Sequence, residues 1–122
     1  MIPAAQTPGV HELASAAADA YALRARDALL LPFKRRIASW LIRADIWQEA
    51  SAPGAKNAAA RAEATERARN AVVELDEQVV NLSDIKFPDT ISAKLVAGEL
   101  ADMKKSYTAI RATLVEIGAK AA

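Results

Sequence analysis

The segment "TISAKLVAGELADMKKSYTAIRATLVEI", residues 90–117, decides the fold of this 122-residue chain. Its apolar positions advance in alternating steps of three and four residues: Ala93, Val96, Leu100, Met103, Tyr107, Ile110, Leu114 and Ile117. Such spacing repeats every 3.5 residues and keeps one narrow apolar stripe facing a neighbouring helix. The segment therefore predicts a long helix with coiled-coil-like packing that ends at Gly118, because glycine commonly follows the last helical residue.

A second segment, residues 55–82, carries the same pattern in an alanine-rich sequence. Its apolar line advances in steps of four, three, four and three: Ala68, Val72, Leu75, Val79 and Leu82. The link between the two segments, "NLSDIKFPDT" at 81–90, is short. Helices joined by a short connection normally fold back on each other, so the two C-terminal helices are expected to pack antiparallel.

The N-terminal part predicts helix over 10–31 and 32–50, followed by a turn at "SAPG", 51–54. Because proline disturbs a helix interior, we expect a kink or break at Pro32, and a kink is favoured since no glycine there would make a hairpin. The first part has a loose apolar stripe, comprising Leu13, Ala17, Ala20, Leu23 and Leu30. Together these segments predict one all-α domain, 1–122, an elongated three- to four-helix bundle with flexible tails at 1–9 and 119–122.

The residues that carry catalysis or hold metals are scarce in this chain. It has no cysteine, which excludes disulfides, thiolate zinc sites and a cysteine nucleophile. Its single histidine, His11, lies near an expected helix start, and Glu74 with Glu77 form an acidic pair that we interpret as a solvated face. We therefore expect no enzyme activity, no metal and no cofactor. Without a signal peptide or an apolar run of spanning length, the chain is expected to be cytoplasmic and not bound to a membrane.

Residues 32–50 are apolar on two sides when drawn on a helical wheel. One side spans about 120° of arc and predicts the core-facing stripe: Phe33, Ile37, Trp40, Leu41, Ala44 and Trp47. Ile42 and Ile46 fall on the opposite side. A helix that is apolar on two sides is either enclosed within its own domain or shared with another chain, and in so short a chain the second explanation gains weight. We therefore predict Ile42 and Ile46 as interface residues.

Charge is distributed unevenly although the net charge is only +1. Six positive residues fall within twenty positions and are opposed only by Asp27: Arg24, Arg26, Lys34, Arg35, Arg36 and Arg43. This basic strip predicts contact with the phosphates of DNA or RNA, without a motif for sequence-specific recognition. The alternatives are a solvated cationic face, or pairing with the acidic segment 74–84. A membrane-surface role is disfavoured by the expected kink and by Asp45 and Glu49.

These features favour a non-catalytic small helical subunit of a larger nucleoprotein assembly. In this hypothesis the protein packs through its helices against itself or other subunits and presents the basic strip to nucleic acid. The alternative is a protein–protein adaptor, or a ring or connector component of the phage-particle type, with no nucleic-acid role. The first hypothesis depends on the arginines, whereas the second depends on the isoleucines.

Overall fold

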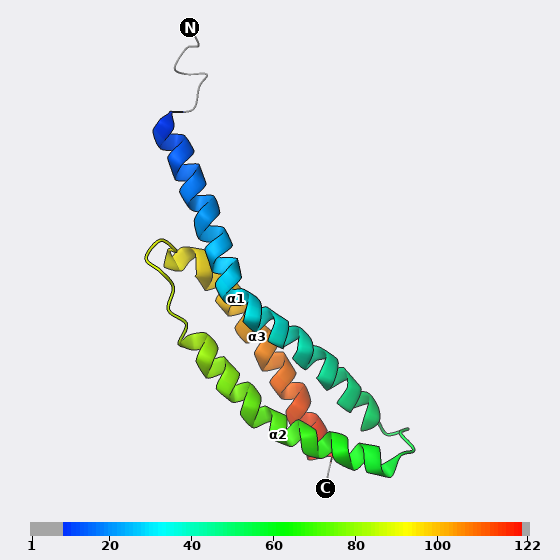
Figure 1. Cartoon of the computed structure of the whole chain (residues 1–122). Coiled ribbons are helices and arrows are strands. Elements are labelled where there is room, and N and C mark those ends of the chain that lie inside the picture. Colours follow the sequence, from blue (N-terminus) through cyan, green and yellow to red (C-terminus); the bar gives the residue numbers. More distant parts are fainter. Residues whose placement is uncertain (1–8, 121–122) are drawn as a thin grey trace.

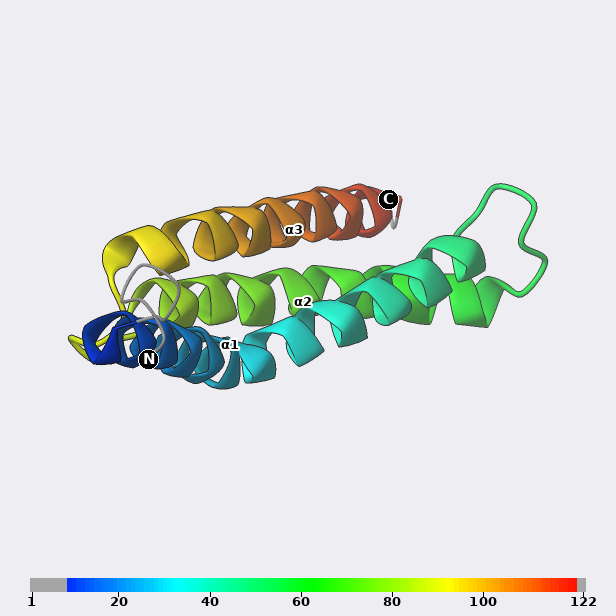
Figure 2. The ribbon, with the colours of Figure 1, turned by 90° about the horizontal axis from the view of Figure 1, so that it is seen from above.

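The structure is a computed structural model that describes residues 9–120, and in this range the chain forms three helices packed into an elongated bundle (Figure 1). They are α1 (Val10–Ala50), α2 (Ala58–Ser83) and α3 (Ala93–Ala119), and no strand occurs among the described residues. Helix α2 runs antiparallel to both α1 and α3 (Figures 1 and 2). The predicted all-α bundle is confirmed, with three helices. Most of the predicted tails, residues 1–8 and 121–122, lies outside the described range.

The core lies along the two predicted heptad stripes. Met103, Tyr107, Ile110, Leu114 and Ile117 of α3 are buried, and they pack against the buried Ala68, Leu75 and Leu82 of α2. Fully burying one leucine or isoleucine side chain contributes about 1.5–3 kcal/mol, so this shared stripe is a main source of stability. Helix α1 closes the third side of the core with Leu30, Ile37, Trp40 and Ala44.

Helix α1 is continuous through Pro32. Its axis changes direction near this residue, so the helix bends and does not break (Figures 1 and 2). A proline in a helix interior removes the backbone bond to the carbonyl four residues earlier, here that of Ala28. Both Pro32 and Ala28 are exposed, so water can reach that carbonyl and the helix continues.

The first turns of α1 extend beyond the bundle. A small second core, formed by Ala22, Ile91 and Val96 with Phe87 against it, marks the last place where α1 touches the other elements. Residues 10–21 are all exposed, and Figure 1 shows this part of the helix projecting past the start of α3. The stripe predicted for the first helix is wrong at Leu13, Ala17, Ala20 and Leu23, which are exposed. The first three precede Ala22, where α1 first meets the bundle, whereas Leu23 adjoins that contact but leaves the helix on another side.

Gly118 lies inside α3 and does not end it, contrary to the prediction. The residue is buried against α2, where a Cβ atom would come within 2.6 Å of Arg69 Cγ. The Arg69 Nε donates a hydrogen bond to the Gly118 carbonyl at 3.0 Å. Glycine at this position therefore lets α2 and α3 approach closely. The helix ends at Ala119, with Lys120 as its cap.

Candidate interaction surface on α1

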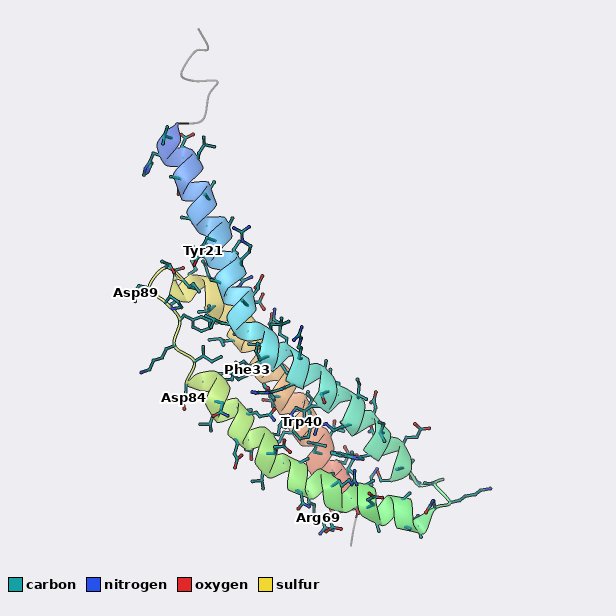
Figure 3. All side chains as sticks on the ribbon, in the orientation of Figure 1. Tyr21, Phe33, Trp40, Arg69, Asp84 and Asp89 are labelled. Carbon is teal, nitrogen blue, oxygen red and sulfur yellow. The ribbon has the colours of Figure 1, made fainter. Side chains whose placement is uncertain are left out.

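The two tryptophans of α1 pack against the core, and Figure 3 shows Trp40 on the side of α1 that faces the bundle. Trp40 is fully buried, and its Nε1 donates a hydrogen bond to Gln78 Oε1 of α2 at 2.7 Å. Trp47 is half-buried and packs against the same core. The predicted core stripe is confirmed except at Leu41, which is exposed because it falls at the edge of the stripe, beyond the line of contact. The tryptophans therefore serve packing.

The opposite side of α1 is exposed along nearly its whole length. Ile42 is 62% exposed and Ile46 57% exposed, as predicted for residues that its own chain leaves uncovered. At 100° per residue, fourteen exposed residues share about 100° of arc centred opposite the core; four of them, Val10, Ala20, Ser39 and Glu49, are set aside here, and the other ten are considered together. We call this set the outer face: Leu13, Ala17, Tyr21, Arg24, Ala28, Leu31, Arg35, Ala38, Ile42 and Ile46. Five of its members are large apolar side chains, three are alanines and two are arginines.

Two of the six predicted basic-strip residues are held by α3. Glu99 forms salt bridges with Lys34, at 3.0 Å between Nζ and Oε2, and with Arg26, at 3.7 Å between Nη2 and Oε1. Arg26 also pairs with Asp27 and donates a hydrogen bond to the Leu95 carbonyl at 2.9 Å. These two charges are therefore used within the fold, and their acidic partner is Glu99, not the segment 74–84.

Two further members of the basic strip lie over aromatic rings. The Cζ of Arg43 is 3.8 Å from the ring centroid of Trp40, and the Cζ of Arg36 is 5.4 Å from that of Phe33. Arg43 also donates a hydrogen bond to Ser39 Oγ at 3.2 Å. Because a guanidinium over an indole covers that ring, Arg43 completes the packing of Trp40 on the side toward solvent.

Arg24, Arg35 and Arg36 are the members of the strip that stay exposed, and no salt bridge in residues 9–120 involves them. Arg24 and Arg35 belong to the outer face, whereas Arg36 lies on the flank toward α2. The six residues thus occupy different sides of the helix. The continuous cationic strip suggested by their spacing is divided between structural and exposed positions.

Comparison of the chain with protein-family models, with curated proteins and with solved structures finds no match. Its function is therefore inferred from its own residues and their geometry. Among the described residues, no group of three or more His, Asp or Glu side chains is placed to hold a metal ion. No helix in this range is both long enough and apolar enough to cross a membrane.

A cationic depression lies between the first turns of α2 and the C-terminal end of α3, and it was not predicted from the sequence. It has a volume of about 430 Å³, is open to solvent, and is lined by Arg61, Arg69 and Lys120 together with Thr65 and Glu66. Arg61 and Arg69 are eight positions apart and share one side of α2, which the sequence could have shown. The contribution of Lys120 depends on how α3 ends against α2, and no local pattern gives that.

The remaining titratable candidates are not gathered into one site. His11 lies in the exposed first turn of α1, and Glu74 and Glu77 are exposed on α2. Tyr107 is buried in the core, and its hydroxyl has no hydrogen-bond partner. Burial raises the pKa of Tyr107 above its usual value, and the positive charge of Arg36 opposes part of that rise. Tyr107 is therefore a packing residue that is neutral at physiological pH.

Proposed function

We propose that this protein is a non-catalytic helical subunit of a larger assembly and that it docks onto a protein partner through the outer face of α1. The observation that carries this proposal is the exposure of Ile42 and Ile46 on the same face as Leu31, Tyr21 and Leu13. Single exposed apolar residues are ordinary on protein surfaces, whereas an extended apolar stripe is typical of an interaction site.

The fold supports this function because the outer face contributes nothing to the core. Trp40, Ile37 and Leu30 fasten the other side of α1 to α2 and α3, so the bundle is complete without a partner on the outer face. On the other helices, exposed large apolar residues do not form a stripe as long as the one on the outer face. On α2 the outward pair Val73 and Val80 stands alone, and Glu77 lies exposed between them in the sequence.

Photo-crosslinking in the cells that make the protein tests this proposal. The crosslinking amino acid p-benzoylphenylalanine replaces Ile42 in one variant and Val80, which is 58% exposed on α2, in a matched control. We expect protein adducts at position 42 and few at position 80, and mass spectrometry then identifies the adduct. Equal or absent crosslinking at the two positions would refute docking through the outer face.

A second candidate function is binding of a nucleic-acid backbone without sequence specificity. It is favoured by the exposure of Arg24, Arg35 and Arg36. Weighing against it, Arg26 and Lys34 are paired with Glu99 and Arg43 covers Trp40. A contact of three phosphates gives weak binding that falls steeply with salt, so protein docking is the function that the geometry supports best.

The test of this second function is a charge reversal that keeps the packing intact. The test variant keeps Arg43, which covers Trp40, and has glutamate in place of three arginines: Arg24, Arg35 and Arg36. The control variant changes the net charge by the same amount and has glutamate in place of three lysines of α3: Lys94, Lys104 and Lys105. Fluorescence anisotropy with a labelled single strand and a labelled duplex, at low and moderate salt, measures binding. Loss of salt-sensitive binding in the arginine variant alone supports the function, and the same binding by both variants refutes it.

A further inference from the structure

We propose that the partner of the outer face is a second copy of this chain and that the two α1 helices pack side by side in antiparallel orientation. This inference rests on the proposed function and names its partner. Two uncovered features of α1 carry it: the projecting first turns, residues 10–21, and the isoleucine pair Ile42 and Ile46 near the other end. In an antiparallel pair, the first turns of each copy cover the isoleucines of the other.

The outer face complements itself in size when it is reversed. With the two-fold axis between residues 29 and 30, Leu31 lies opposite Ala28 of the second copy, Ile42 opposite Ala17, and Tyr21 opposite Ala38. Each of these layers combines one large and one small side chain, which is how helices interdigitate at close distance. Leu13 and Ile46 then meet at both ends of the interface.

A parallel pair would pack less well because every residue would meet its own copy. The layer at position 21 would hold two tyrosines and the layer at position 17 two alanines, so the interface would be overfilled at one level and empty at another. Both errors weaken a packed interface. The alternation of large and small side chains on the outer face therefore favours the antiparallel orientation.

Charge complementarity supports the same register. Asp27 and Lys34 lie on the same flank of the outer face, and in the antiparallel pair Asp27 of each copy lies next to Lys34 of the other. Within one chain Asp27 pairs with Arg26 and Lys34 with Glu99, so the contact between copies would extend these ion pairs and not replace them. The Asp27 and Lys34 side chains keep substantial exposure, at 56% and 43%. Arg24 of each copy shares a layer with Arg35 of the other, and these like charges oppose the pairing; their long stems can pack there only with the guanidinium groups turned to water. Charged residues inside a helix interface lower its stability and fix its register.

The interface reaches the size that a specific complex needs. Helix α1 has 41 residues and is therefore about 60 Å long. A strip about 10 Å wide along this whole length gives about 1,200 Å² over both copies, which is the lower end of the standard range for stable interfaces and an upper figure here, because α1 bends near Pro32. The dimer also supports residues 10–21, because helix with no tertiary contact is only marginally stable in water.

Light scattering of the purified full chain across a range of concentrations tests the dimer. We expect a mass of twice 13.0 kDa at high concentration, dissociating on dilution. The double variants Ile42→Asp with Ile46→Asp, and Leu13→Asp with Ala17→Asp, should each give the mass of one chain. The control, Val73→Asp with Val80→Asp on α2, should stay dimeric, because these residues are similarly exposed, at 63% and 58%, but lie off the outer face.

Disulfide mapping tests the orientation and needs no change in charge. The chain has no cysteine, so introduced thiols are unique. Mixing Ala17→Cys with Ile42→Cys under oxidising conditions should give mainly the mixed disulfide, whereas Ala17→Cys with Val80→Cys should give little. Predominant bonding of Ala17→Cys to its own copy would overturn the antiparallel register. If an aspartate variant loses helicity in circular dichroism, the cysteine pairs decide the interface alone.

The outcomes separate this inference from the proposed function. A monomer at all concentrations, with no mixed disulfide, overturns the dimer. If photo-crosslinking at position 42 then captures a different protein, docking through the outer face stands and only the identity of the partner is wrong. If position 42 gives no adduct of any kind, both proposals fall.

Discussion

Replacing Trp40 with phenylalanine tests whether this residue holds α1 onto the bundle as the structure shows. The change removes the hydrogen bond from Trp40 Nε1 to Gln78, which contributes about 1 kcal/mol, and leaves a smaller ring in a fully buried place, which costs about 1–2 kcal/mol more. The expected loss is therefore about 2–3 kcal/mol in the free energy of unfolding. Alanine at this position would cost about 3–5 kcal/mol, a large part of the about 5–15 kcal/mol typical of a domain.

Urea unfolding followed by circular dichroism at 222 nm, at one fixed protein concentration, measures this loss. Trp47→Phe is the matched control, because Trp47 is half-buried, and we expect it to cost less than about 1 kcal/mol. Each variant also keeps a single tryptophan, so the emission of Trp40 alone should lie at shorter wavelength than that of Trp47 alone. Equal losses for the two variants, or a loss below about 0.5 kcal/mol for Trp40→Phe, would refute the assignment.

The remaining predictions concern α3. Gly98→Ala should raise the thermal midpoint by a few degrees, because alanine stabilises a helix by about 0.5–1 kcal/mol relative to glycine and a Cβ at this position meets nothing within 4 Å. Gly118→Ala should lower the midpoint, because its Cβ would meet Arg69. Scanning calorimetry compares the two variants, and equal shifts would contradict the packing at Gly118. Tyr107→Phe should change stability at pH 7 by less than about 1 kcal/mol, since the hydroxyl it removes is unpaired. Because the pKa of Tyr107 is raised in the folded state, its contribution to the free energy of unfolding is complete below the usual pKa of 10.0 and is lost as the pH rises above that value. The urea midpoint should therefore fall less between pH 9 and pH 11 in Tyr107→Phe than in the unmodified protein. An equal fall in both proteins would contradict the burial of Tyr107.

The packing of α2 and α3 could be predicted from sequence because one strong pattern specifies it. From Val96 to Ile117, every heptad position of α3 is buried or half-buried. A heptad stripe states both that a helix forms and which side faces a neighbour, so local information suffices. Gly118 shows the limit of such reasoning: its neighbour Arg69 comes from a distant part of the chain, and only the packed structure distinguishes a helix end from a close approach.

The N-terminal half of α1 could not be predicted in the same way. Leu13 follows a helical stripe but is exposed, because burial requires a neighbour and α3 begins beside Ala22. Leu23 is exposed because it lies on a different side of α1 from Ala22. At Pro32 the sequence predicted a kink or break and favoured the kink, and the favoured prediction is confirmed, because α1 continues through Pro32. Leu41 was assigned to the core from an arc that was about one residue too wide.

The candidate basic strip depended on information that the sequence lacks. Counting charges correctly identifies a cationic segment, but Glu99, which pairs with Arg26 and Lys34, lies far away in the chain. The stacking of Arg43 on Trp40 joins two residues that are one turn apart, so this contact was within reach of a helical wheel. In contrast, the two-sided apolar pattern left two possibilities for Ile42 and Ile46, enclosure within the domain or a surface for another chain, and their exposure excludes the first.

The two sides of α1 differ in composition in a way that separates folding from association. The core side carries both tryptophans, Trp40 and Trp47, together with Leu30, and these side chains pack into the core that α1 shares with α2 and α3. The outer face has alanines at three positions among its large residues, and in the reversed pair each of these alanines lies opposite a large side chain of the other copy, so that the two stripes can interdigitate. Changes at Ile42 should therefore weaken association while leaving the helicity and the urea midpoint of the monomer nearly unchanged. Changes at Trp40 should lower the urea midpoint and also weaken association, because the dimer face exists only on a folded bundle.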